Sequence, residues 1–229
     1  ASRAFTEGYY YKPRVDYELL KEHSEGIIAL SGCLGGEIAQ FLAPDGSVEE
    51  GNKEGERSYP KALEKAKFYQ SIFGEENFFI ELHNHGIEQQ KIILPDLLKI
   101  SEELNAPLVA TNDSHYVNKG DASAHDALLC VQTNATLDDK TRFKFDGSGY
   151  YVKSSEEMRK LFPEKKYPKA CDNTLEIAER VEYSFNSPKY YLPAFPVPDE
   201  SKSLEEYLNK KVLEGAKKVY PEISKEVKD

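Results

Sequence analysis

Three short apolar runs along the chain each end in polar or glycine residues. They are Gly26 to Gly32 (GIIALSG), Asn77 to His83 (NFFIELH) and Pro107 to Asp113 (PLVATND). Runs of this kind predict buried parallel strands whose carboxyl ends open into loops. Helical patterns precede the three runs, over residues 16–23, 59–72 and 89–104. The alternation predicts βα units in a parallel sheet or barrel, with any active loops at the carboxyl ends of the strands.

The second half of the chain shows helical patterns around one segment that resembles a hairpin. A helix is predicted after Asp121, with an apolar side formed by Ala124, Leu128, Leu129 and Val131. Phe143 to Val152 (FKFDGSGYYV) has β-prone flanks around glycines and predicts a hairpin. Ser154 to Glu157 resembles a helix start, followed at helical spacing by Met158, Leu161 and Phe162. Cys171 to Val181 is a further amphipathic helix.

Two segments predict irregular structure. Ala43 to Arg57 is polar, acidic and rich in glycine, which is typical of an exposed loop. Tyr190 to Pro198 has three prolines in six residues, so it is predicted to be an extended linker. A last helix is expected from Leu204 to Lys218.

Composition narrows the class of protein. Charged residues make up 31% and apolar residues 39%, as in ordinary soluble globular proteins, and no apolar run approaches the length of a membrane helix. The start of the chain does not resemble a signal peptide. The cysteines are widely spaced, which favours a reducing cytoplasm over a disulfide framework: Cys33, Cys130 and Cys171. The net charge of −10 predicts that the chain alone is a poor general DNA binder.

The strongest candidate for chemistry is Asn112-Asp113-Ser114-His115. In an extended segment, Asp113 and His115 point to the same side, so both can reach one ion. A carboxylate and an imidazole suit zinc, manganese or iron. The alternative is that Asp113 caps the following turn and His115 makes a loop hydrogen bond.

Two further groups of residues carry weaker signals. Cys33 lies in a glycine-rich turn after the first strand, where it is either a thiolate ligand or nucleophile, or a small residue packed under a turn. Glu81, His83 and His85 lie on one side if the second strand continues that far, although Gly86 indicates a turn. The remaining histidines are interpreted as surface or helix-packing residues: His23 and His125.

Several segments along nearly the whole chain together form a recognisable series. They are 8–14 (GYYYKPR), 28–36 (IALSGCLGG), 81–86 (ELHNHG), 109–116 (VATNDSHY), 124–133 (AHDALLCVQT), 145–147 (FDG), 173–178 (NTLEIA) and 192–198 (LPAFPVP). In this order they resemble the polymerase-and-histidinol-phosphatase (PHP) domain of the bacterial DNA polymerase III alpha subunit. The resemblance implies an α/β fold, namely part of a distorted (βα)7 barrel with a C-terminal hairpin and helical extension. It further implies three parts: residues 1–135 from the barrel, 136–198 as extension and linker, and 199–229 leading toward a polymerase module.

The resemblance also implies a metal site at the strand ends. In the family up to three metal ions are held by nine side chains, of which Cys33, Asp113 and His115 match three. The matching histidine His85 is placed beside the site, together with Asn112, Glu81 and His83. The other ligands belong to an N-terminal part with a paired-histidine motif that has no counterpart here. The chain alone is therefore expected to bind metal weakly or not at all.

The resemblance leaves two functions open. In the first, the parent protein is a replicative DNA polymerase whose PHP domain uses Zn²⁺ or Mn²⁺ to hydrolyse 3′ ends, while the absent polymerase module uses Mg²⁺. In the second, the domain is a scaffold that docks a proofreading exonuclease subunit, within a replicase that also holds a sliding clamp and DNA. A weaker alternative is a free-standing phosphoesterase such as histidinol phosphatase. No membrane partner is expected, and the location implied is the cytoplasm.

Overall fold

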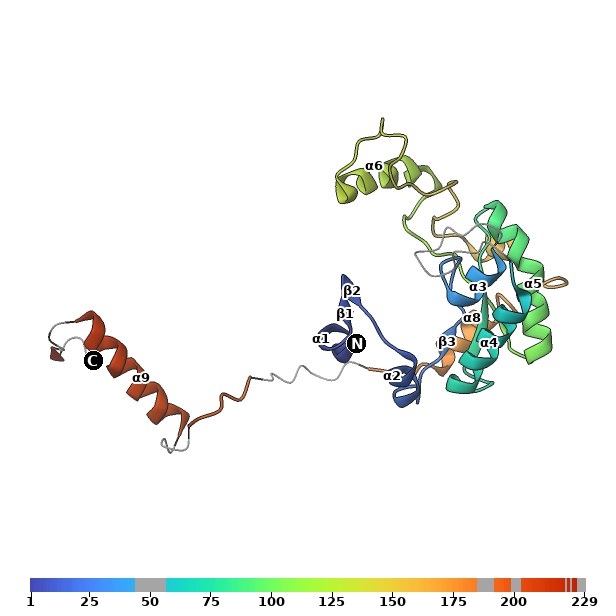
Figure 1. Ribbon diagram of the computed structural model, residues 1–229. Helices are drawn as coiled ribbons and strands as arrows, with labels where there is room; N and C mark the ends of the chain where they lie inside the picture. Colours follow the sequence, from blue (N-terminus) through green and yellow to red (C-terminus); the bar gives the residue numbers. More distant parts are fainter. Residues whose placement is uncertain (44–56, 185–191, 199–202, 221, 223, 226–229) are drawn as a thin grey trace. The chain divides into compact units, whose positions relative to one another are not determined.

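The computed structural model describes residues 1–43, 57–184, 192–198, 203–220, 222 and 224–225 (Figure 1). The chain divides into two units, Ala1–Glu182 and Tyr183–Asp229. The first unit contains α1 (Ser2–Thr6), β1 (Tyr9–Tyr10), β2 (Lys12–Pro13), α2 (Tyr17–Glu22), β3 (Ala29–Leu30), α3 (Glu37–Leu42), α4 (Tyr59–Phe73), β4 (Phe78–Leu82), α5 (Glu88–Leu104), β5 (Leu108–Ala110), the 3₁₀ turn η1 (Lys119–Asp121), α6 (Ala122–Thr133), α7 (Ser155–Leu161) and α8 (Asn173–Arg180). The second unit contains α9 (Leu204–Val219).

The three predicted strands form one parallel sheet in the order β3-β4-β5. Ala29 pairs with Phe78 in one ladder, and Glu81 pairs with Val109 in the other. The strands are shorter than the apolar runs that predicted them, because each run continues into the loop at its carboxyl end. The preceding helices are also confirmed, as α2, α4 and α5, so the chain has the predicted mixed α/β fold.

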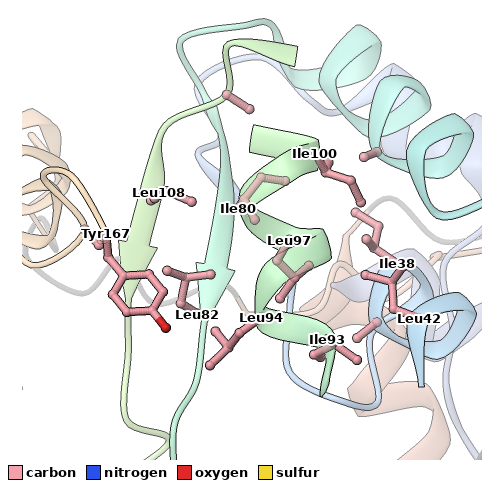
Figure 2. Packing of buried hydrophobic residues seen from close by; sticks show 14 of the residues in the cluster. Ile38, Leu42, Ile80, Leu82, Ile93, Leu94, Leu97, Ile100, Leu108 and Tyr167 are labelled. Carbon is pink, nitrogen blue, oxygen red and sulfur yellow. The ribbon is translucent and has the colours of Figure 1, made fainter. Parts of the chain in front are cut away.

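The main hydrophobic core lies between this sheet and the helices α3, α4 and α5. Figure 2 shows side chains of α5, such as Leu94 and Leu97, among those of β4 and α3. In α5 the buried positions recur at helical spacing: Gln90, Ile93, Leu94, Leu97 and Ile100. The opposite face of the sheet is covered too, because Phe79 and Val109 are 0% and 2% exposed. Burial on both faces is typical of parallel sheets.

The two edges of the sheet differ. On the β5 side, the Ala110 N–H donates to the Ala170 carbonyl at 2.8 Å, and the Asn173 side chain donates to the Leu108 carbonyl at 2.7 Å. The segment before α8 therefore covers that edge. Within the described residues, no strand pairs with the outer side of β3, where Leu30 is 39% exposed. The barrel inferred from the resemblance is not closed by these three strands.

The predicted hairpin over Phe143 to Val152 is wrong. Its second half pairs with the segment after β5: Tyr151 forms a parallel bridge with Tyr116, and the Val152 N–H donates to the Tyr116 carbonyl at 3.2 Å. Its first half packs against α6, where the Phe145 ring centroid lies 5.1 Å from that of His125. The two halves have other partners, so they do not pair with each other.

The remaining predicted elements are largely confirmed. The helix predicted after Asp121 is α6, the one from Cys171 is the shorter α8, and the last helix is α9. The apolar side predicted for α6 is wrong, because only Leu129 of its four residues is buried, while Leu128 and Val131 are 63% and 79% exposed. Residues 192–198 have no regular secondary structure, as the prolines predict, while 190–191 and most of the loop predicted at Ala43 to Arg57 lie outside the described residues. Among the described helices, none is both long and apolar enough to span a membrane.

The helix predicted at Ser154 begins with a complete capping box. The Ser154 hydroxyl accepts from the Glu157 N–H at 3.2 Å, and the Glu157 carboxylate accepts from the Ser154 N–H at 2.9 Å. We expect Ser154→Ala to lower the free energy of unfolding by about 1 kcal/mol. Urea denaturation followed by circular dichroism measures this change. Ser148→Ala, in an exposed turn, is the control, and equal stability of the two variants would contradict the prediction.

Candidate functional site

Asp113 and His115 lie together just beyond the carboxyl end of β5. The Nε2 atom of His115 is 3.3 Å from Oδ1 of Asp113, and the two side chains are 35% and 45% exposed, respectively. Asp113 has a left-handed backbone conformation with φ of 44°, which aspartate adopts more readily than most residues. Asp113 and His115 were predicted to lie together because alternate residues of a strand point to the same side. In the structure, a turn brings them together instead.

Aromatic rings pack around the His115 imidazole. Its ring centroid lies 4.6 Å from that of Phe145, 5.5 Å from that of His125 and 5.9 Å from that of Tyr150. The His115 N–H donates to the Tyr150 carbonyl at 2.8 Å. Both the ring and the backbone of His115 are thus held by neighbouring segments while its Nε2 atom stays beside Asp113.

Glu81 joins the carboxyl ends of all three strands. Its carboxylate accepts from the Gly32 N–H after β3 at 3.1 Å and from the Thr111 hydroxyl after β5 at 2.5 Å. The His83 Nε2 atom lies 3.1 Å from the same carboxylate and 2.6 Å from the Thr111 hydroxyl oxygen. The Glu81 N–H donates to the Ser31 hydroxyl at 2.8 Å. Glu81 and His83 therefore point to one side, as predicted, but they bind each other and their neighbours.

The environment of Glu81 keeps it ionised. Burial by itself would raise the pKa of the Glu81 carboxyl group, but the hydrogen bonds from His83, Thr111 and Gly32 outweigh it and leave the pKa below its usual value of 4.5. The charged form is therefore the one that holds the strand ends together.

His85 is buried and has partners on both ring nitrogens. The Gln90 side-chain amide donates to Nδ1 at 2.8 Å, and Nε2 donates to the Asn112 carbonyl at 2.7 Å. Its ring stacks on Tyr150 at 4.1 Å, and burial lowers the pKa of its imidazole from 6.5. Gly149 packs against the His85 backbone so closely that an added Cβ would lie 3.1 Å from the His85 Cα. His85 thus lies beside Asp113 as a neutral brace.

Asn112, like His85, helps to hold the turn at Asp113 in place. Its side-chain amide donates to the Tyr151 carbonyl at 2.6 Å, and its side-chain oxygen accepts from the Lys153 ammonium at 2.8 Å. Lys153 also donates to the Gly149 carbonyl. These bonds tie the turn before Asp113 to residues 149–153, so the position of Asp113 depends on a segment about 40 residues away in sequence.

Cys33 lies in an exposed position of the turn after β3. The turn is tight, because the Gly36 N–H donates to the Cys33 carbonyl at 2.9 Å and a Cβ on Gly36 would lie 2.7 Å from the Ser31 carbonyl oxygen. Burial, together with the negative charges of neighbouring groups that include Asp113 and Cys33, raises the pKa of Tyr150 to about 12. Tyr150 is therefore close enough to both residues for their charges to act on it.

The described residues supply only part of a metal site. Within the described part of the chain, no group of three His, Cys, Asp or Glu side chains is placed to hold one ion. Asp113 and His115 offer one oxygen and one nitrogen ligand, whereas zinc sites take four ligands. The donor types fit a divalent metal but the set is incomplete, and the metal roles of Cys33, Asp113 and His115 stay predictions.

Several residues around the site were not predicted from the sequence. Tyr150, Thr111 and Gln90 contact the candidate residues through the fold and carry no sequence signal of their own. His125 was interpreted as a surface or helix-packing residue, yet its ring lies against His115 and Phe145. Gly149 was interpreted only as part of a hairpin turn, although a glycine at this position permits the close approach to the His85 backbone.

Comparison with known proteins places these features in a family. Residues 1–85 match the PHP domain model. The alpha subunit of DNA polymerase III from Deinococcus radiodurans is 44% identical over 225 residues, covering 96% of this chain and 16% of that protein. Those from Treponema pallidum and Thermus aquaticus are 40% and 41% identical, covering 100% and 97% of this chain. The chain spans about a sixth of the length of these relatives, 16% to 18%.

The fold and site define an α/β protein that gathers ionisable side chains at the carboxyl edge of a parallel sheet. Residues 1–85 belong to the PHP domain family, and the chain matches a segment of bacterial DNA polymerase III alpha subunits along nearly its whole length. The resemblance drawn from the sequence motifs is confirmed. The domain boundaries at residues 135 and 198 stay predictions.

Proposed function

We propose that this chain is a segment of a cytoplasmic replicative DNA polymerase, a DNA-directed nucleotidyltransferase that acts on DNA with Mg²⁺ in a separate polymerase module. Support comes from relatives named DNA polymerase III subunit alpha, which match the chain over nearly its whole length. In the replicase, the partners of the parent protein are a sliding clamp and a proofreading exonuclease subunit.

The PHP segment contributes to a phosphodiesterase site that removes 3′-terminal nucleotides. The observation that carries this proposal is the contact between Asp113 and His115, partly exposed and braced from behind by His85 and Asn112. Cys33, Asp113 and His115 would hold Zn²⁺ or Mn²⁺ together with ligands from outside the described residues. Bound ions would supply Lewis acidity for phosphodiester hydrolysis. The part of this chain is to hold these ligand atoms in place.

The three parallel strands form part of a distorted (βα)7 barrel with a helical extension. Two observations support this fold. Phe79 and Val109 are buried on the face opposite the helices, where a barrel has its interior. The outer side of β3 has no partner strand among the described residues, and Leu30 and Ile27 beside it are 39% and 48% exposed. A further strand at this edge would cover them.

The alternative is a scaffold that stabilises the polymerase and docks the proofreading exonuclease, with no chemistry of its own. The incomplete ligand set among the described residues and the net charge of −10 favour it. The braced geometry around Asp113 and His115 favours the catalytic proposal, because a scaffold does not require these two side chains to be held together.

The test uses the full-length parent protein. We expect Asp113→Asn to lower bound metal and to reduce 3′-exonuclease activity at least about 100-fold, as losses at metal sites commonly do. Metal content is measured by mass spectrometry and activity on an oligonucleotide with a mispaired 3′ end. Asp138→Asn, at an exposed position with the same charge change, is the control. Unchanged metal content and activity in Asp113→Asn would leave the scaffold as the function of this segment.

A further inference from the structure

The N-terminal residues form a compact hairpin with its own internal bonds. β1 and β2 pair Tyr9 with Pro13 and Tyr10 with Lys12, and Tyr11 occupies the turn with φ of 58°. The Arg14 N–H donates to the Gly8 carbonyl at 3.2 Å. A Cβ on Gly8 would collide with the Arg14 carbonyl oxygen, so only glycine fits there. We call residues Tyr9–Arg14 the tyrosine hairpin.

The tyrosine hairpin exposes its aromatic rings. Tyr9, Tyr10 and Tyr11 are 57%, 62% and 80% exposed, and the neighbouring Phe5 is 64% exposed. The Tyr10 and Tyr11 rings meet edge to face at 4.7 Å, and Tyr9 contacts Phe5 at 5.5 Å. Four large exposed aromatic rings within seven residues of sequence are unusual on a protein surface and indicate an interaction site.

The same hairpin carries positive charge that the described structure does not neutralise. The Arg14 guanidinium lies 5.0 Å from the centroid of the Tyr10 ring. Within the described residues, no carboxylate lies within ion-pair distance of Lys12 or Arg14, whereas Arg3 pairs with Glu7 and Glu22. In a chain with a net charge of −10, the hairpin thus places two cations without carboxylate partners beside exposed aromatic rings.

We propose that the tyrosine hairpin binds single-stranded nucleic acid. Bases stack on Tyr10 and Tyr11, and Lys12 and Arg14 pair with the backbone phosphates. Surfaces that bind single strands without sequence preference combine these two features. Tyrosine and arginine also occur often in protein interfaces, but lysine is depleted at their centres. The presence of Lys12 beside Arg14, both without a carboxylate partner, therefore favours a phosphate backbone as the ligand. The inference uses none of the residues of the Asp113–His115 site and does not rest on the phosphodiesterase proposal.

The first test measures stacking in the 229-residue chain. Fluorescence anisotropy with a labelled oligo-dT strand is expected to show that Tyr10→Ser with Tyr11→Ser weakens binding at least about fivefold. The high exposure of both side chains lets this variant fold, and circular dichroism verifies it. Tyr183→Ser, which removes another exposed tyrosine, is the control. Photocrosslinking with 5-iodouracil in the strand is expected to label Tyr10 or Tyr11.

The second test measures the phosphate contacts. Between about 50 and 200 mM salt, Lys12→Ser with Arg14→Ser is expected to reduce the slope of log K against log salt by about 1.4, for two contacts to a single strand. Lys61→Ser with Lys67→Ser, on the exposed side of α4, is the control and leaves the slope unchanged. Equal affinity and slope in hairpin and control variants would overturn the proposal. Altered self-association of the hairpin variants with unchanged DNA affinity would overturn it in favour of a protein-docking surface.

Discussion

Replacement of Glu81 by alanine is expected to lower the free energy of unfolding by about 3–5 kcal/mol. The Glu81 side chain is only 12% exposed, and its carboxylate accepts hydrogen bonds from the Gly32 N–H and the Thr111 hydroxyl. Alanine leaves both of these donors without the acceptor that joins β3 and β5 to β4. Each buried donor left unpaired costs about 1–3 kcal/mol. Urea denaturation followed by circular dichroism measures the loss.

Two matched variants distinguish the loss of the carboxylate acceptor from the loss of a side chain in general. Glu81→Gln keeps one acceptor oxygen but turns an amide donor toward one of the donors, so its stability is expected to lie between those of the wild type and the alanine variant. Glu64→Ala, at an exposed position on α4, is expected to change the free energy of unfolding by less than about 0.5 kcal/mol. A loss below about 1 kcal/mol in Glu81→Ala would show that the strand ends do not depend on this carboxylate.

The contribution of Glu81 depends on pH in a definite direction. Its pKa in the folded protein is lowered from 4.5, so the folded state binds fewer protons than the unfolded state near that pH. The stabilisation is complete above pH 4.5 and is lost as the pH falls through the folded pKa. The difference in stability between the wild type and Glu81→Ala should therefore shrink in acid below pH 4.5.

The sheet was predictable from sequence because its signals are local. The three apolar runs and the helices before them have spacings that specify strand or helix without knowledge of the rest of the fold. α3 was missed because Glu37–Leu42 directly follows a glycine-rich turn and has no capping side chain, whereas the equally short α2 begins after the capping residue Asp16. The hairpin at Phe143 to Val152 was wrongly predicted because the competing partners, Tyr116 and His125, are distant in sequence.

The candidate site, like the fold, could be predicted only in part from the sequence. The proximity of Glu81 and His83 follows from their spacing in the chain and could be predicted. Asp113 and His115 were also predicted to lie together, but for the wrong reason, because a turn at Asp113 and not strand alternation brings them together. The roles of Tyr150, Thr111 and Lys153 could not be predicted, because these residues reach the site only after distant segments have packed together. For the same reason the sequence did not show that His85 has both ring nitrogens occupied, which excludes it as a free ligand in this conformation.

His85 is the second residue whose replacement is expected to have a large effect. His85→Ala should lower the free energy of unfolding by about 3–5 kcal/mol, because it removes two hydrogen bonds and a stacked ring and leaves a cavity. His85→Phe keeps a ring to stack on Tyr150 but leaves the Asn112 carbonyl and the Gln90 amide unpaired, so a smaller loss is expected. His23→Ala, at a side chain that is 61% exposed, is the control.

The dependence of stability on pH distinguishes the contribution of a titrating imidazole from that of an aromatic ring without a titrating group. Burial lowers the pKa of His85 from 6.5, so the folded state resists protonation that the unfolded state accepts. The stabilisation from neutral His85 is complete above pH 6.5 and falls as the pH decreases toward the folded pKa. His85→Phe lacks a titrating group at this position, so its stability should decline less steeply below pH 6.5 than that of the wild type. Equal slopes in the two proteins would show that His85 accepts a proton in the folded state as readily as in the unfolded chain, and would contradict its role as a neutral brace behind Asp113.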